Sequence, residues 1–298
     1  MSTEPLRARG DLEPNQKRDL TLPPEPDALP VAVADSHCHL DIQDGEHYLE
    51  VSAALSRAAA VGVTRIVQIG VDVASSEWSV RAANDHANVL AAVALHPNEA
   101  PRLEAEHGRA ALEQAWADIA RLATEPRVRA IGETGLDFFR TGPEGVATQE
   151  ESFRRHIQIA KAAGKAVVIH DRDAHDDVVR VLLDEGAPEK VVFHCFSGDA
   201  QLARTAAEHG WYCSFAGTVT FKNSHNLREA LALLPSELLL VETDAPFLTP
   251  TPYRGRPNAS YLIPLTVRHM AEVRGQELEA LCQALSDNTE QVFGRFDA

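Results

Sequence analysis

Short runs of apolar residues recur along the chain from residue 31 onward, and stretches with helical spacing separate them. Eight of these runs have the length and the near-continuous apolar character of strands that are buried on both faces; they are residues 31–34, 65–69, 89–95, 128–131, 166–169, 191–193, 212–215 and 238–241. Regular alternation of such strands with helices predicts a parallel sheet that is covered by helices.

The stretches between the runs carry helix signals. Thr148 and Glu151 form a capping-box pattern that predicts a helix start, and apolar residues follow with helical spacing. An apolar stripe within 178–183 is followed by Gly186, which predicts a helix end. Eight strand–helix units over the last 268 residues (298 − 30) fit an α/β fold of the (β/α)8 TIM-barrel type, which typically has ~250 residues.

A doubly wound open sheet is the structural alternative. It fits less well, because no G-x-G-x-x-G motif follows the first run and because eight units is many for that fold. We therefore predict a single TIM-barrel domain over residues 31–298.

Residues 1–30 differ from the rest of the chain. They hold six of the 17 prolines, no Phe, Trp or Tyr, and no sustained apolar period. Such a segment buries too little apolar surface to offset the entropy of ordering it. We expect a disordered or loosely packed N-terminal tail whose end packs on the base of the barrel.

Composition and charge narrow the class of protein. The chain is 44% apolar and 24% charged, with a formal net charge of −16, as in a soluble globular protein. The longest apolar run is about seven residues, against the ~20 of a transmembrane helix. With no secretory signal and only four cysteines, we expect a cytoplasmic protein with reduced thiols and no membrane partner. The acidity argues against nonspecific coating of nucleic acid but not against an enzyme that holds a few phosphates.

Polar residues that bind metals follow several of the apolar runs. His37 and His39 follow the first run, and since strand side chains alternate between faces, both rings point one way and Cys38 the other. Four further candidates follow four other runs, namely Glu133, His170, His194 and Asp244. The C-terminal ends of barrel strands meet at one mouth, so these groups converge there.

A shared metal centre would compensate the burial of these six groups, which would be costly without partners. Nitrogen and oxygen donors suit Zn, Mn, Fe or Co, and Mg would rely on the carboxylates. Six ligands exceed one tetrahedral ion and leave room for two. In the predicted arrangement His37 and His39 hold one ion, His170 and His194 hold the other, Glu133 bridges them, and Asp244 ligates and orients or deprotonates the attacking water.

The motifs around these residues resemble those of the TatD family of metal-dependent deoxyribonucleases. They are D-S-H-C-H-L (35–40), A-L-H-P (94–97), I-G-E-T-G-L-D (131–137), V-V-I-H-D-R-D-A (167–174), H-C-F-S-G (194–198) and E-T-D-A-P-F-L-T-P (242–250). The resemblance implies a TIM barrel, a divalent-metal site built from the six ligands, two ions per chain (Mg, Mn or Zn), and hydrolysis of DNA phosphodiesters with Asp244 and Glu133 as catalytic residues.

Two positions depart from the family pattern. Asn98 stands where the family often has a histidine, and Ser260 stands where a proline is common. Both lie in predicted substrate-facing loops. They bear on substrate preference more than on metal binding.

The substrate side of the predicted site is cationic and aromatic. We expect His96, Arg172 and Arg254 to contact substrate, and Arg172 to meet a phosphate with its planar guanidinium. Ser197 and Gly198 are predicted to open a helix whose free N–H groups attract anions. Three aromatic residues are candidates for stacking on a base, namely Phe138, Phe139 and Tyr253.

The predicted function is a metal-dependent DNase, a 3′–5′ exonuclease acting on single-stranded DNA or 3′ ends. One alternative is the same centre cleaving an aminoacyl-tRNA ester or an amide; the net charge of −16 mildly favours a small or neutral substrate. Another is a non-catalytic scaffold, which has no need of six ligand positions. The acidic helices suggest solubility without a partner, which is compatible with a monomer.

Overall fold

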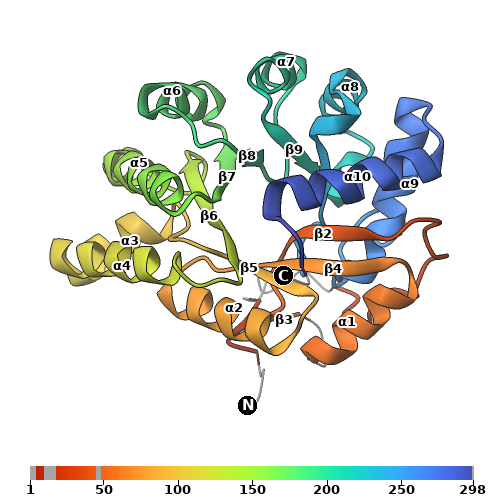
Figure 1. Cartoon of the computed structure of the whole chain (residues 1–298), viewed down its shortest axis with the longest axis horizontal. Coiled ribbons are helices and arrows are strands. Elements are labelled where there is room, and N and C mark those ends of the chain that lie inside the picture. The colour runs from red at the N-terminus through yellow and green to blue at the C-terminus, as the bar shows by residue number, and fades with distance from the viewer. Residues whose placement is uncertain (1–4, 10–17, 45–47, 297–298) are drawn as a thin grey trace.

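Eight parallel strands form one sheet, and helices cover its outer face (Figure 1). This computed structural model describes residues 5–9, 18–44 and 48–296. The sheet strands are β2 (Val33–Cys38), β4 (Val63–Ile69), β5 (Val89–Val93), β6 (Val128–Asp137), β7 (Ala166–Arg172), β8 (Val191–Phe193), β9 (Tyr212–Phe215) and β10 (Leu239–Val241). The helices are α1 (Val51–Ala60), α2 (Val73–Asp85), α3 (Glu99–His107), α4 (Arg109–Leu122), α5 (Val146–Ala163), α6 (His175–Glu185), α7 (Ala200–His209), α8 (His225–Leu233), α9 (Ile263–Arg274) and α10 (Leu278–Phe293).

The sheet is a nearly closed barrel. Its order, β10-β9-β8-β7-β6-β5-β4-β2, follows the chain from one edge to the other, whereas a doubly wound sheet would reverse direction in its middle. At the two edges, a parallel bridge joins Cys38 of β2 to Ala245 in the segment after β10. The predicted TIM barrel is therefore confirmed.

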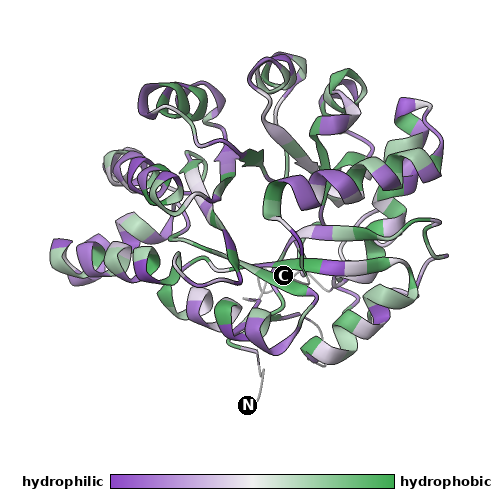
Figure 2. Ribbon diagram, in the orientation of Figure 1, coloured by the Kyte–Doolittle hydropathy of each residue, from purple (hydrophilic) through white to green (hydrophobic). Residues whose placement is uncertain are grey.

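Two layers of buried side chains hold the barrel together. One layer lies between the strands and the helices, and the other fills the barrel interior with alternate strand residues such as Val67, Ile69 and Leu90. The end of α10 adds Val292 and Phe293 to the interior layer and so covers one end of it. Figure 2 shows the resulting pattern, with hydrophobic residues concentrated on the strands and hydrophilic ones on the outer helix faces.

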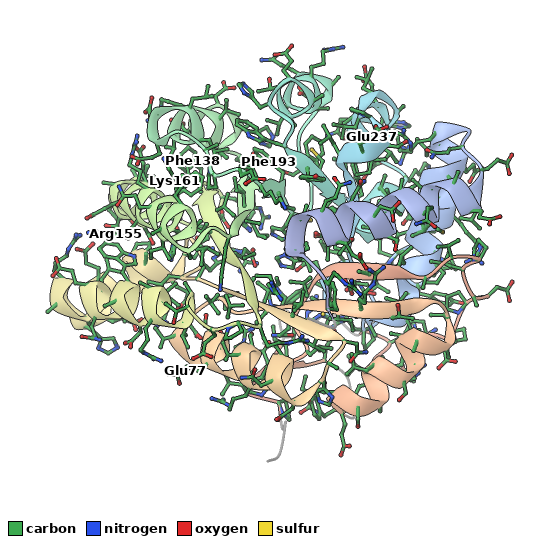
Figure 3. The ribbon with its side chains drawn as sticks, in the orientation of Figure 1. Glu77, Phe138, Arg155, Lys161, Phe193 and Glu237 are labelled. Atoms are coloured by element: carbon green, nitrogen blue, oxygen red, sulfur yellow. The ribbon has the colours of Figure 1, made fainter. Side chains whose placement is uncertain are left out.

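The outer faces of the helices carry charged side chains. Arg155 and Lys161 extend outward from α5, and Phe193 of β8 is buried in the layer between strands and helices (Figure 3). No described helix has both the length and the apolar character that crossing a membrane would require. The four cysteines all lie in the described part of the chain and carry free thiols.

Three strands run further than the apolar pattern predicts. The strands β2, β6 and β7 continue through His37, Glu133 and His170 to Cys38, Asp137 and Arg172. Apolar runs mark where a strand is buried between helices, but backbone pairing continues into the polar segment, since the neighbouring strands extend there as well. Most of the candidate ligands therefore sit on or beside regular strand backbone.

Two predicted helix starts are wrong. Helix α5 begins at Val146, and Thr148 lies inside it, where its hydroxyl donates to Glu104 instead of capping the helix. Helix α7 begins at Ala200 rather than at Ser197, and the carboxylate of Asp199 accepts the free N–H groups of Gln201 and Leu202. The predicted anion site at the start of α7 is thus already satisfied by an acidic side chain.

The described parts of the N-terminal segment, 5–9 and 18–30, contact the barrel, although the sequence predicts a loose tail. A short strand, β1 (Arg7–Ala8), pairs with β3 (Ile42–Gln43). Further along, Pro23 accepts a hydrogen bond from the buried Tyr261, and Leu29 is buried beside Gly62. Residues 1–4 and 10–17 lie outside the described residues, and the domain boundary at residue 30 stays a prediction.

A buried histidine links α5 to the two strand ends that carry the site. The Nε2 atom of His156 accepts a hydrogen bond from the Leu95 N–H at 3.2 Å, so the ring proton sits on Nδ1, 2.9 Å from the Thr134 hydroxyl. Burial disfavours the charged ring and lowers the pKa of His156 to about 3. His156 therefore remains neutral in the folded protein.

This neutral ring predicts a component of acid unfolding. The neutral ring contributes its full stabilisation of the folded protein at pH values above 6.5, the pKa of the ring in the unfolded chain. As the pH falls from there toward 3, the free energy of unfolding decreases by up to about 1.4 kcal/mol per pH unit. A glutamine keeps one donor and one acceptor without titrating, so we expect the unfolding free energy of His156→Gln to fall less steeply below pH 6.5. Denaturant unfolding of both proteins between about pH 4 and 7 checks this, and parallel curves would contradict it.

Candidate metal centre

The structure brings all six predicted ligands to one mouth of the barrel. On one side, Nε2 of His39 lies 3.4 Å from Oδ1 of Asp244, and Nε2 of His37 lies 3.7 Å from the same oxygen. On the other side, His170 and His194 face Glu133. Three groups of potential ligand atoms result, namely His37–His39–Asp244, His37–Glu133–His194 and His96–Glu133–His170.

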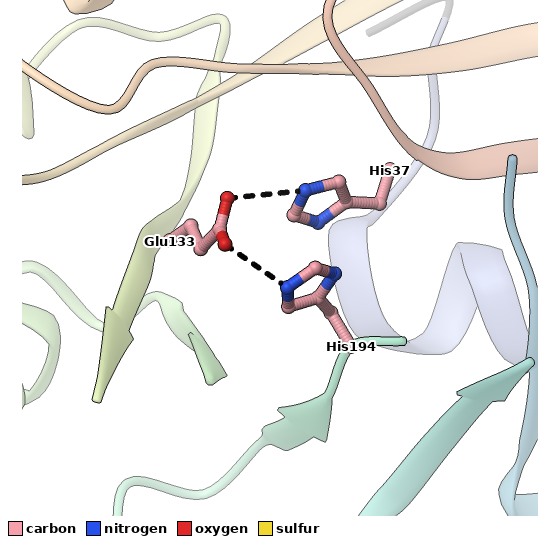
Figure 4. Close-up of side chains that lie close together, drawn as sticks. All are labelled: His37, Glu133 and His194. Atoms are coloured by element: carbon pink, nitrogen blue, oxygen red, sulfur yellow. Dashed lines mark hydrogen bonds and ion pairs between the residues drawn. The ribbon is translucent and has the colours of Figure 1, made fainter. Parts of the chain in front are cut away.

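Glu133 lies between the two sides and presents a different oxygen to each. Its Oε2 faces Nε2 of His37 at 3.4 Å and Nε2 of His39 at 3.8 Å. Its Oε1 faces Nδ1 of His170 at 2.7 Å and Nε2 of His194 at 3.1 Å. Figure 4 shows this two-sided arrangement for His37, Glu133 and His194.

Close approach of two strands places Glu133. A Cβ on Gly132 would lie 2.5 Å from that of Val168, and a Cβ on Gly135 would lie 2.1 Å from the carbonyl oxygen of His170. Gly135 also has a φ of +136°, which disfavours any other residue. Glycines on both sides of Glu133 thus let β6 lie against β7 and point the carboxylate toward His170.

His37 provides a test of whether the residues fit a metal ion. Its ring is only 1% exposed, and among the described residues neither ring nitrogen has a hydrogen-bond partner. An unsatisfied buried imidazole is costly unless something else engages it. Ligands that share an ion at ~2.0–2.2 Å lie roughly 3–3.6 Å apart, close to the distances around His37. The donor set therefore fits a divalent metal.

Hydrogen bonds on the far side of three rings fix which nitrogen faces the site. Nδ1 of His39 lies 3.2 Å from the Ile69 carbonyl, which can only accept, so this nitrogen carries the proton. Nδ1 of His194 lies 3.2 Å from Oε1 of Glu242, and Nε2 of His170 lies 3.2 Å from Oδ2 of Asp137. With the proton kept on this outer nitrogen, each ring would offer its other nitrogen to a bound ion, as a metal ligand must.

Asp244 is held in a conformation that ordinary residues avoid. Its φ is +54°, and its N–H donates to the carbonyl of His37 at 2.9 Å. Such backbone persists where the surroundings fix it, often at functional sites. Burial favours the neutral acid, but the hydrogen bond from His39 and the charges of His37 and His39 hold the pKa of Asp244 below its ordinary value.

His96 enters the site, but with a different proton arrangement. Its Nε2 lies 3.3 Å from Oε1 of Glu133, within one of the three groups of potential ligands. Its Nδ1, however, accepts the N–H of Asn98 at 3.1 Å, so the neutral ring carries its proton on Nε2. Burial lowers the pKa of His96 and favours this neutral form. His96 is thus a hydrogen-bond donor toward the mouth.

Asn98, at the first departure from the family pattern, supports a ligand. Its amide nitrogen donates to Oδ2 of Asp137 at 3.1 Å, and Asp137 in turn holds His170. Its amide oxygen accepts from Thr141 and Gln149. The sequence places Asn98 in a substrate-facing loop, whereas the structure places it in a network behind His170.

The predicted substrate-side cations lie around the mouth and not among the ligand atoms. The guanidinium of Arg172 lies 3.8 Å from the ring centre of Phe139, which is 64% exposed. The guanidinium of Arg254 lies 4.4 Å from the ring centre of Phe221. Within the described residues, neither arginine forms an ion pair with a carboxylate.

Sequence reasoning missed the two carboxylates that orient ligand rings, Glu242 and Asp137. Glu242 is fully buried and also accepts the Cys195 N–H at 2.8 Å. Both residues were visible as polar positions at strand ends. Their roles depend on which histidine the barrel places beside them, and that is a contact between distant segments.

A TIM barrel that gathers histidines and carboxylates at one mouth has the architecture of a metal-dependent hydrolase. The sequence model of the family described as TatD-related DNase matches residues 34–294. The chain belongs to this family, as its motifs predict. A metal-dependent hydrolase named TatD from Mycobacterium tuberculosis is 44% identical over 266 residues, covering 88% of this chain and 98% of the relative. The metal-dependent hydrolase YcfH from Escherichia coli K12 is 36% identical over 264 residues, covering 88% and 95%.

Solved structures agree with this assignment. YjjV, a TatD homologue from E. coli K12, superposes with a TM-score of 0.80 at 27% identity, covering 88% of this chain and 98% of that one. A TatD family hydrolase from Entamoeba histolytica has a TM-score of 0.76 at 19% identity, covering 91% and 100%, and supports the fold alone. The protein is thus a metal-dependent hydrolase, which removes the non-catalytic scaffold.

The contact between Glu242 and His194 yields a prediction. Glu242→Gln keeps the side-chain volume but allows its amide nitrogen to face Nδ1 of His194, which frees the ring to change its tautomer. We expect affinity for Mn²⁺ or Zn²⁺ to fall by about 10–100-fold, as is typical when a group behind a ligand is removed. Calorimetric metal titration checks this, with unchanged circular dichroism as the control. Wild-type affinity in the folded variant would show that Glu242 does not orient a ligand.

Proposed function

We propose that the protein is a two-metal phosphodiesterase that hydrolyses DNA. The supporting observation is the two-sided carboxylate of Glu133, whose Oε2 faces His37 and His39 and whose Oε1 faces His170 and His194. A carboxylate with both oxygens directed at separate nitrogen pairs suits a bridge between two ions.

The residues divide between the two ions as follows. His37, His39 and Asp244 would hold one ion, and His170 and His194 would hold the other, with Glu133 shared. When bound, the ions supply positive charge to the phosphate and lower the pKa of bound water. The protein orients the rings of His39, His194 and His170 through their contacts with Ile69, Glu242 and Asp137, respectively.

Two residues would act on the reacting groups directly. Asp244 remains ionised because its pKa is lowered, and its carboxylate lies at the mouth, where it would accept a proton from the attacking water. The N–H at Nε2 of His96 would donate to a phosphate oxygen, which retains its predicted role in substrate binding. Glu133 would remain ionised between the imidazole rings of the site.

The rim supports a nucleic-acid substrate. Arg172 and Arg254 carry positive charge that no described carboxylate neutralises, and each lies against an aromatic ring. Such a pair can meet a phosphate with the cation and a base with the ring. Since the protein as a whole carries a charge of −16, local cations at the mouth would have to hold the substrate. We propose that the substrate is single-stranded DNA, which the enzyme hydrolyses from a 3′ end.

Removal of the proposed base or of one ligand tests the reaction. Asp244→Asn should lower the rate of single-stranded DNA hydrolysis in Mg²⁺ or Mn²⁺ by about 10²–10⁴-fold, the usual contribution of a general base. His170→Ala should abolish it through loss of one ion. Arg180→Gln on α6, which alters an exposed ion pair with Glu150 of α5, is the matched control. A folded, metal-loaded Asp244→Asn protein with wild-type rates would overturn the role of Asp244.

Assays on a panel of substrates distinguish hydrolysis of the DNA phosphodiester bond from hydrolysis of the ester and amide bonds that such a centre could also cleave. Wild-type protein is assayed beside His170→Ala on 3′-tailed single-stranded DNA, aminoacyl-tRNA and a cyclic amide. We expect turnover of the DNA alone, lost in the variant. Hydrolysis of the ester or amide with inertness toward DNA in several metals would replace the nuclease with another hydrolase.

Phe139 tests whether the rim stacks on a base. Its exposed ring lies on the Arg172 guanidinium, and its N–H donates to Asp137 beside the centre. Stacking on one base contributes ~1–3 kcal/mol, so Phe139→Ala should raise KM for single-stranded DNA roughly 5–150-fold and change kcat little. Leu183→Ala, another exposed apolar residue but on α6, serves as the control. Unchanged KM in Phe139→Ala would remove this contact.

A further inference from the structure

The barrel has a seam, and part of the metal centre lies across it. The end of β2 and the segment after β10 meet through three contacts, namely the Cys38–Ala245 bridge, the His39 N–H donating to the Ala245 carbonyl at 2.8 Å, and the Asp244 N–H donating to the His37 carbonyl at 2.9 Å. The group His37–His39–Asp244 takes two members from one side of this seam and one from the other. The distance between its members therefore depends on what holds the two sides together.

The N-terminal segment ties the loops that follow these ligands. Strand β1 pairs with β3, which begins three residues after His39. The N–H groups of Leu6 and Arg7 donate to the Asp41 carbonyl, and the Arg7 guanidinium donates to its carboxylate at 2.6 Å. The Asp41 side chain is fully buried, so this segment is fastened to the end of β2 and not merely laid over it.

Two arginines of the segment each reach both sides of the seam. Arg9 donates to the Asp44 carboxylate at 2.9 Å on the β2 side and to the Pro246 carbonyl at 3.1 Å on the β10 side. The Arg18 guanidinium donates to both carboxylate oxygens of Asp44, at 2.8 and 2.7 Å, and to the Gly255 carbonyl at 2.8 Å. We name Arg9, Arg18 and Asp44 the seam clamp.

The seam clamp is largely buried and lies next to a ligand. The side chain of Asp44 is 5% exposed and that of Arg18 is 13% exposed. The Arg9 guanidinium lies 4.8 Å from the ring centre of Phe247, and the Phe247 ring lies edge-on to His39 with centres 6.3 Å apart. Removing one member of such a pair leaves the other buried without a partner, so the clamp resists opening.

Arg9 and Arg18 precede the residues that the family model matches. The family match begins at residue 34, and the M. tuberculosis relative is covered almost in full by 88% of this chain. We propose that Arg9 and Arg18 are positioning residues of the metal centre. By joining Asp44 to the loop after β10, they set the spacing of His39 and Asp244 and so strengthen the ion held across the seam. The inference rests on the two-ion centre proposed above.

Graded removal of metal from the whole protein tests the clamp. Purified metal-loaded protein is dialysed against increasing concentrations of chelator, and the Zn²⁺ or Mn²⁺ retained per chain is counted. In Arg9→Gln/Arg18→Gln we expect one ion to be lost at a chelator activity about 10-fold lower or more, while the other is retained as in wild type. Arg180→Gln should retain metal as wild type does. Arg9→Lys/Arg18→Lys should retain metal to a degree between wild type and the double glutamine variant, because lysine keeps the positive charge but lacks the planar guanidinium.

The outcomes separate the clamp from the proposed function. Equal retention in the double variant and wild type, or equal weakening of both ions, would overturn the clamp, the latter because it signals general destabilisation. His39→Ala identifies the affected ion, which must be the one that His39 holds. If wild type retains a single ion, the two-ion centre fails, and the clamp is then decided by whether that ion is lost earlier in the double variant.

Discussion

The carboxylate of Glu133 is the constraint on which the rest of this structure depends. It lies 4% exposed at the barrel mouth, facing imidazoles from four different strand ends. Burial alone would favour its neutral form, but the charge of His194 and the hydrogen bonds of His170 and His194 hold the pKa of Glu133 well below its ordinary value. A buried anion of this kind requires its partners. The strand ends that carry these partners therefore have to converge around Glu133, and their convergence makes the site.

The sequence predicts the strands and the side chains that converge at the mouth because both depend on local patterns. Apolar runs locate all eight sheet strands, and a His or carboxylate directly after a run lies at the mouth of a barrel. The helix starts at Thr148 and Ser197 failed for a different reason: their side chains are engaged by Glu104 and by the Asp171 carbonyl. Such partners come from distant segments, as do those of Glu242 and Asp137, and no window of sequence contains them.

The N-terminal segment shows where compositional reasoning stops. Few apolar residues and many prolines predict that residues 1–30 form no core of their own. The described parts are held instead by hydrogen bonds to their backbone, such as those from Tyr261 to Pro23 and from Arg256 to Thr21 and Leu22. The donors lie more than 200 residues away. Extended backbone next to an existing surface offers carbonyls without any apolar signature.

The proton positions at the mouth divide the histidines into two kinds. His39, His170 and His194 each have an acceptor on the side away from the site, so with a metal ion bound each would keep its proton there and ligate through the other nitrogen. In His96, Nδ1 accepts a hydrogen bond on the side away from the site, so the neutral ring faces the site with its Nε2–H group. A lone pair suits a cation, whereas an N–H suits an anionic oxygen. The backbone N–H of Asn98, rather than any side chain, makes this distinction, so a single main-chain contact would separate the proposed substrate-binding histidine from the proposed metal ligands.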